Sequence, residues 1–122
     1  MKAEVAKRLL DAVVAARRIQ KFIAGLDFES FSASELVGSA VERQFEIIGE
    51  ALSKAGAADS GLVDKIPALP KIVGLRNRLI HGYDRVDDEI LWDVIQSKIP
   101  PLLGQLEDQL KSEDYPTQCE EH

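Results

Sequence analysis

Residues 76–83, R-N-R-L-I-H-G-Y, bring together side chains that titrate near neutrality with side chains that bind anions. The imidazole of His81 has an unperturbed pKa of about 6.5, which suits a general acid or base at neutral pH. Arg76 carries a planar fork of donors that can bind a phosphate and stabilise negative charge as it develops. Asn77 can orient either group or hold a phosphate oxygen. These residue types suit a reaction that moves protons beside a phosphate.

The same residues also have purely structural interpretations. Cationic side chains near a helix C-terminus stabilise that end by about 0.3–1 kcal/mol, and His81 directly before Gly82 fits this pattern. Tyr83 can be a packed aromatic with a hydrogen-bonded hydroxyl. Arg78 can be a solvated or salt-bridged surface residue. The residue types alone leave both interpretations open.

The spacing of Arg76 and His81 sets a geometric condition. Five residues apart on a regular helix, the two positions point about 140° apart. They converge within one chain only if the helix ends before His81, and Gly82 allows such an end. A dimer is the other solution, because it can supply one group from each chain. Glu46 and Glu50, four residues apart on one helical face, either support Arg76 or are simply solvated.

Other chemical signatures are missing from the sequence. The only histidines are His81 and His122, so no His/Cys metal cluster is available, and we expect no metal and no cofactor. There is no glycine-rich phosphate loop and no nucleophile elbow. The single cysteine, Cys119, cannot form an internal disulfide, which fits a reducing compartment.

The charge distribution limits how the chain could bind a nucleic acid. The chain has a net charge of −6, which argues against broad nucleic-acid groove binding. Residues 71–85, however, carry four cations against one carboxylate, a local balance of +3, so the remainder carries −9. This distribution is compatible with a local phosphate site on an acidic body.

Apolar residues at helical spacing predict a helix over most of the chain. The first helix carries the stripe from Val5 to Leu26, with Gly25 as its stop signal. The second opens with a capping box of Ser32 and Glu35 and closes at Gly56. A short turn lies around residues 62–66.

Three further helices are expected after this turn. The third begins at Pro67 and Pro70 and stops near Gly82, so it carries the chemical segment. The fourth begins at Asp87 and Asp88, where carboxylates favour a helix N-terminus. Pro100 and Pro101 interrupt it, and a last helix holds Leu102, Leu103, Leu106 and Leu110.

The sequence therefore predicts an all-α protein, an up-and-down bundle of four to five helices. No stretch alternates with the period of a strand. Residues 1–111 form the expected helical domain, and the acidic residues 112–122 are expected to be a disordered tail. With no apolar run long enough for a membrane span and no signal peptide at its N-terminus, the chain is expected to be cytoplasmic.

The segment at 76–83 resembles the R-x4-H-x-Y motif of the HepT branch of the HEPN superfamily, with Arg76, His81 and Tyr83 in the three motif positions. A polar residue after the arginine, here Asn77, is also typical of ribonucleases in that superfamily. E-R-Q-F-E-I-I-G-E-A, residues 42–51, is similar to the second-helix signature of the same branch. The resemblance covers roughly residues 4–110.

This resemblance implies a HEPN-like bundle that forms a homodimer and acts as an endoribonuclease. The activity would be metal-independent, with the ribose 2′-OH as internal nucleophile, Arg76 and His81 as catalytic residues and Asn77 in support. The chain would be the toxin of a type VII-like toxin–antitoxin system, silenced by AMPylation of Tyr83 by a minimal nucleotidyltransferase antitoxin. The alternative is a non-catalytic helical module that binds nucleotides or docks a nucleotidyltransferase.

Overall fold

The computed structural model describes residues 2–81 and 87–113, with His81 described by its backbone alone. These residues form α1 (Ala3–Ile23), α2 (Phe28–Ala33), α3 (Glu35–Ala58), α4 (Leu62–Lys65), α5 (Leu69–His81), α6 (Asp88–Ser97) and α7 (Ile99–Ser112). No strand is present in the described ranges, so the predicted all-α class is confirmed. Five of the helices are long, and α2 and α4 are short.

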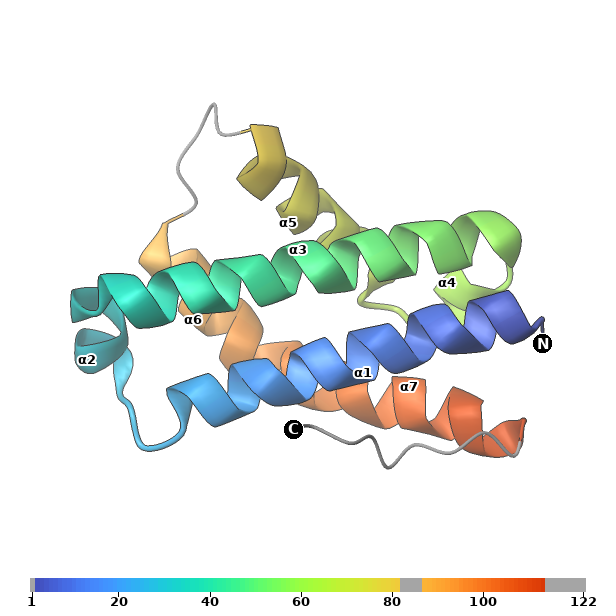
Figure 1. Cartoon of the computed structure of the whole chain (residues 1–122), viewed down its shortest axis with the longest axis horizontal. Coiled ribbons are helices and arrows are strands. Elements are labelled where there is room, and N and C mark those ends of the chain that lie inside the picture. The colour runs from blue at the N-terminus through green and yellow to red at the C-terminus, as the bar shows by residue number, and fades with distance from the viewer. Residues whose placement is uncertain (1, 82–86, 114–122) are drawn as a thin grey trace.

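The two longest helices organise the bundle. In Figure 1, α1 and α3 run side by side in opposite directions. Helix α5 packs against α3, on the side away from α1, and α7 packs against α1 and α6. Helix α3 therefore lies between α1 and the helix that carries the chemical segment.

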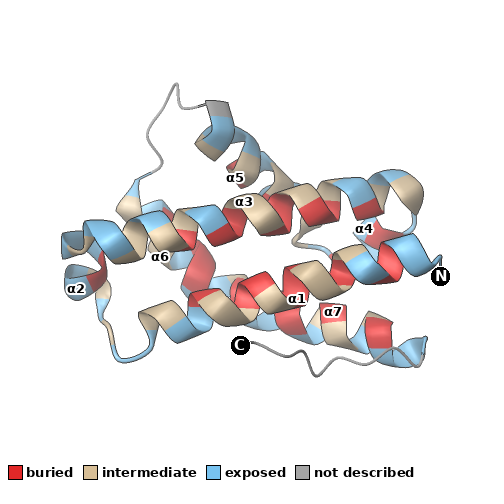
Figure 2. Ribbon diagram, in the orientation of Figure 1, coloured by how far each residue is buried: buried red, intermediate tan, exposed pale blue. Residues whose placement is uncertain are grey.

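The core follows the apolar stripes of these helices, as the red bands in Figure 2 show. Its largest fully buried side chains include Leu9, Ile48, Leu52, Ile72 and Leu102, which come from four different helices. Burying one such side chain completely contributes about 1.5–3 kcal/mol. Among the described side chains of α5, only Ile72 and Leu75 are buried, so much of that helix remains at the surface.

The structure corrects two of the predicted boundaries of α3. Its N-cap is Ser34, whose hydroxyl accepts a hydrogen bond from the backbone N–H of Val37 at 3.1 Å. The predicted capping box at Ser32 and Glu35 is therefore wrong. Gly56 does not close the helix, which continues to Ala58, because the side chain of Leu69 packs against Gly56 there. The predicted stop after α1 is confirmed, since Gly25 has a φ of 80°.

Helix α2 was not predicted from the sequence, and its N-terminus has a capping box of Asp27 and Ser30. The carboxylate of Asp27 accepts from the backbone N–H of Ser30 at 2.8 Å, and the Ser30 hydroxyl accepts from the backbone N–H of Asp27. The bonds from Ser30 lower the pKa of Asp27. Because α2 is a single short amphipathic stretch, helical periodicity alone does not separate it from its neighbours.

Helix α2 anchors the start of α6. The ring of Trp92 lies 5.1 Å from that of Phe31 and 6.3 Å from that of Phe28, measured between centroids. The Ser32 hydroxyl donates to the Asp88 carboxylate at 2.9 Å. The predicted start of α6 is confirmed, because Asp87 is its N-cap and accepts from the backbone N–H of Glu89. The start of α6 is thus fixed to the bundle.

The C-terminal part agrees with the predicted proline interruption. Helix α6 ends at Ser97, and Pro100 and Pro101 lie in the first turn of α7. Helix α7 extends to Ser112, and residues 114–122, most of the predicted tail, lie outside the described residues. None of the described helices has the length and apolarity that crossing a bilayer requires.

Candidate functional site

Helix α5 approaches α3 most closely where Arg76 meets Gly49. A Cβ atom at position 49 would lie 2.2 Å from the Cβ of Arg76 and 2.6 Å from its Cγ, far inside van der Waals contact. Only glycine leaves room for this approach. The glycine of the I-G-E-A segment therefore has a specific task, which is to let the stem of Arg76 lie directly on the backbone of α3.

Two neighbours restrain the guanidinium of Arg76. Its Nη2 donates to Oε1 of Glu50 at 2.6 Å, and its Nη1 donates to Oδ1 of Asn77 at 2.9 Å. The Nε atom is buried and has no hydrogen-bond partner among the described residues. A guanidinium has five N–H donors, so two N–H groups on the terminal nitrogens remain for another acceptor. The side chain is 26% exposed, which leaves it accessible to a ligand.

Glu50 also pairs with Lys54, whose Nζ lies 3.1 Å from its Oε2. This hydrogen bond and the charge of Lys54 lower the pKa of Glu50, and the charges of Arg76 and Arg8 act in the same direction. The carboxylate is therefore ionised at neutral pH. The row Lys54–Glu50–Arg76 carries one net positive charge and fixes the direction of the guanidinium. Of the two glutamates proposed to support Arg76, Glu50 contacts it, and Glu46 pairs with Arg43 at 3.2 Å.

Arg76 lies at the edge of a hollow of about 570 Å³ formed by α1, α3 and α5. Four arginines line it: Arg8, Arg18, Arg43 and Arg76. Ile80, which is 50% exposed, lies beside Arg76 at the same edge. The hollow is within the size range of pockets that bind small ligands, and its lining is suited to anions.

The structure brings Arg76 and Asn77 together but leaves the other two predicted site residues untested. The His81 side chain and the whole of Tyr83 lie outside the described residues. Helix α5 includes His81, in agreement with the predicted stop near Gly82, so the condition for convergence within one chain is not met. Positions 76 and 81 are therefore about 140° apart around one regular helix. Arg78 is exposed, as its interpretation as a surface residue requires.

The other three arginines that line the hollow lie outside the 76–83 segment and were not among the predicted site residues. Arg8, Asp11, Ala15 and Arg18 follow one another at intervals of three, four and three, which places them on one face of α1. That spacing was a usable signal. The local charge was a second signal, because residues 7–21 carry five cations against one carboxylate, a balance of +4.

The chain is similar to known proteins over the helices that form this site. Residues 13–108 match the family model for ribonuclease HepT-like proteins, a range that runs from α1 to α7 and includes Gly49, Glu50 and Arg76. The chain belongs to the HepT-like ribonuclease family. The resemblance inferred from the motif is thus confirmed over most of the chain.

Individual HepT-like relatives are similar over nearly their full length. A "Probable ribonuclease HepT" of Thermococcus cleftensis is 34% identical over 99 residues, 81% of this chain and 89% of its own. Proteins named "Putative RNase" from Methanocaldococcus jannaschii and Caldanaerobacter subterraneus are 32% and 34% identical. They cover 87% and 75% of this chain, and 96% and 80% of their own. No solved structure gives a significant match.

Proposed function

We propose that this HepT-like chain is a metal-independent endoribonuclease and the toxin of a type VII-like toxin–antitoxin system. In the proposed reaction the ribose 2′-OH attacks the adjacent phosphorus, the bond to the 5′-oxygen breaks, and a 2′,3′-cyclic phosphate forms. One proton leaves the 2′-OH and one is delivered to the departing 5′-oxygen. His81 serves as a general acid or base in these transfers.

The observation that carries the proposal is the restrained guanidinium of Arg76. Glu50 and Asn77 each take one N–H, and two N–H groups on the terminal nitrogens remain for phosphate oxygens. A donor group fixed before substrate arrives needs little reorganisation when charge develops on the phosphorane. Asn77 acts in support, because its carbonyl oxygen holds the second terminal nitrogen of Arg76.

The angular separation of positions 76 and 81 supports a two-chain site. Since α5 is helical through His81, a single chain does not bring the two positions to one side of the helix. In a two-fold homodimer, Arg76 of one chain can work with the histidine of the other. Ile80 supports this arrangement, because it is an exposed apolar residue next to His81.

Silencing is proposed to act at Tyr83, two residues beyond His81. A minimal nucleotidyltransferase antitoxin would transfer AMP from ATP to the phenol oxygen, with release of pyrophosphate. The attached AMP adds bulk and negative charge near the phosphate site, so it repels substrate phosphate. The support for this step is the position of Tyr83 in the R-x4-H-x-Y motif and the membership in the HepT-like family.

The test compares alanine variants of the motif in a cleavage assay on unmodified protein. Arg76→Ala or His81→Ala should lower the cleavage rate by about 10²–10⁴ and abolish growth arrest. Arg78→Ala is the matched control and should behave as wild type, because Arg78 is an exposed residue of the same helix. Folded His81→Ala protein that cleaves RNA at the wild-type rate would reject the proposal and favour the non-catalytic module.

A further inference from the structure

The hollow between α1, α3 and α5 has a surplus of positive charge. Three carboxylates line it together with the four arginines, and each is already paired. Asp11 pairs with Lys7 at 2.5 Å, Glu46 with Arg43 at 3.2 Å, and Glu50 with both Lys54 and Arg76. Four cations thus pair with these three carboxylates, and two further arginines, Arg8 and Arg18 of α1, also line the hollow.

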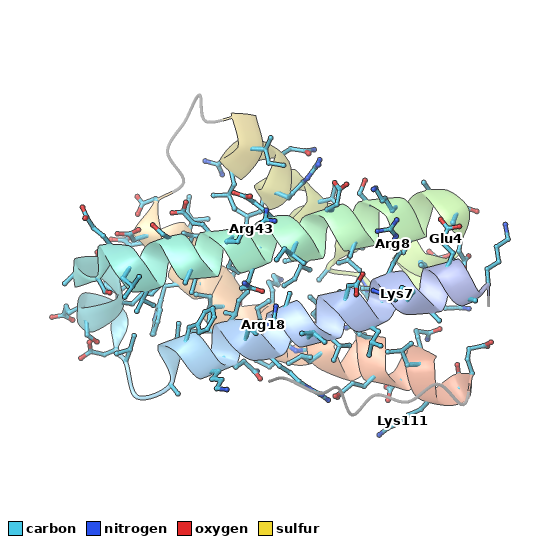
Figure 3. All side chains as sticks on the ribbon, viewed as in Figure 1. Glu4, Lys7, Arg8, Arg18, Arg43 and Lys111 are labelled. Carbon is cyan, nitrogen blue, oxygen red and sulfur yellow. The ribbon has the colours of Figure 1, made fainter. Side chains whose placement is uncertain are left out.

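Arg8 and Arg18 have no ion pair or hydrogen bond with any residue that the structure describes, although both line the hollow. Figure 3 shows both on the side of α1 that faces α3. Each is of intermediate exposure, so its charge is available to a ligand. Counting Lys7 and Lys54, six cations face three carboxylates here, a local surplus of +3 in a chain with a net charge of −6.

The extent of this surface favours a strand over a single phosphate. Arg8 and Arg18 are ten residues apart on α1, which corresponds to about 15 Å along the helix axis. Successive phosphates of one nucleic-acid strand are spaced much more closely than this. Arg76 continues the row of arginines onto α5. A single phosphate cannot contact both ends of the row.

The rest of the lining indicates how such a strand would be recognised. The residues described around the hollow include Val14, Ile47 and Ile80 but no aromatic side chain. The described part of this surface therefore offers no aromatic ring on which a base could stack. Recognition would depend on backbone phosphates, with little sequence preference and a strong dependence on salt.

We propose that Arg8 and Arg18 form a phosphate-binding track on α1 that holds the RNA backbone beside the scissile phosphate at Arg76. The track rests on the proposed function, because it takes the substrate to be RNA. The track adds a face of α1 to the substrate site, although α1 lies outside the R-x4-H-x-Y segment. Its residues bind and position the strand and take no part in proton transfer.

The test measures binding of a 12-nucleotide 2′-O-methyl RNA, which cannot be cleaved through its 2′ position, by fluorescence anisotropy at several salt concentrations. Arg8→Gln/Arg18→Gln is compared with Lys21→Gln/Lys111→Gln. The control removes the same number of charges from exposed sites outside the hollow. Figure 3 shows Lys111 pointing away from α1 and α3.

The arginine pair should weaken binding by roughly 10- to 100-fold at low salt. The slope of log affinity against log salt should become shallower by about 1.4, since each phosphate contact of a single strand contributes about 0.7 to its magnitude. The control pair should stay within about threefold of wild type in both quantities. Equal losses in the two variants, or wild-type binding by the arginine variant, would overturn the track.

Four outcomes separate the possible explanations. If AMP bound as tightly as the 12-mer, the hollow would be a site for a mononucleotide and not for a strand, and the proposal would be overturned. A fall in oligomeric mass of the arginine variant would assign the hollow to an interface between copies, which also overturns it. RNA binding through Arg8 and Arg18 without cleavage of unmodified RNA would retain the track and reject the nuclease. Undiminished RNA binding and cleavage by the arginine variant would reject the track and retain the nuclease.

Discussion

Replacing Gly49 with alanine tests whether the close approach of α5 to α3 positions Arg76. The new Cβ would lie 2.2 Å from the Cβ of Arg76, whereas carbon atoms in contact are about 3.5–4.0 Å apart. The obstructing atom is bonded to the α5 backbone, so a change of rotamer cannot relieve the clash. The two helices must separate locally by about 1.3 Å or more.

The expected cost combines two opposing effects. Overpacking a well-packed interface costs about 1–3 kcal/mol, and occasionally more. The replacement of a helical glycine by alanine returns about 0.5–1 kcal/mol. Because the clash involves atoms close to both backbones, we expect a net loss of about 1–2 kcal/mol, or roughly 4–8 °C in Tm. A displacement of about 1 Å at Arg76 should also lower the cleavage rate by roughly 10²-fold.

The matched control is Gly38→Ala in the same helix, where a new Cβ would have no neighbour within 4 Å. This variant should be as stable as wild type or more stable by about 0.4–1 kcal/mol, with an unchanged cleavage rate. Thermal unfolding followed by circular dichroism gives Tm, and cleavage is measured well below the Tm of every variant. A Gly49→Ala protein with wild-type Tm and rate would refute the argument that this approach positions Arg76.

Three other predictions concern the ion pair, the assembly and the silencing. Glu50→Gln should lower kcat about tenfold without raising KM, since the variant loses the charge that holds Arg76 but not the guanidinium itself. A raised KM at unchanged kcat would contradict this. The lowered pKa of Glu50 means that its stabilising contribution is present above the ordinary glutamate pKa and is lost only as pH falls through the lowered value. The Tm difference between wild type and Glu50→Gln should therefore be constant from pH 6 to 8, and a difference that changes in that range would argue against the assignment. Light scattering should give a homodimer, and a monomer that is fully active would exclude the two-chain site. Tyr83→Phe should remain toxic beside the antitoxin and gain no AMP in intact-mass measurements, whereas neutralisation equal to that of wild type would reject Tyr83 as the acceptor.

Much of the fold could be predicted because the long helices carry strong local signals. The apolar stripe of α1, the positive φ at Gly25 and the Asp87 cap of α6 depend only on neighbouring residues. The boundaries of α3 could not be predicted in the same way. Ser32 and Ser34 are both suitable caps in sequence, and contacts with α6 engage Ser32 elsewhere. Gly56 stays within α3 because tertiary packing at Leu69 outweighs its tendency to end a helix.

In the candidate site, too, only the features that depend on local sequence could be predicted. The residue types of Arg76 and Asn77 indicated phosphate chemistry from the sequence alone. The choice between Glu46 and Glu50 required the crossing of α3 and α5, which brings only Glu50 to the guanidinium. The contributions of Arg8 and Arg18 depend on the packing of α1 beside α3, and no local pattern in α1 encodes that neighbour.

Incubating the purified, unmodified protein with RNA in excess EDTA tests the central claim most directly. Wild type should cleave RNA at the same rate with and without EDTA, and the products should end in a 2′,3′-cyclic phosphate or its hydrolysed form. His81→Ala, assayed in parallel and shown to be folded, should produce none of these ends above background. Cleavage that EDTA abolishes and added Mg²⁺ restores would contradict the account.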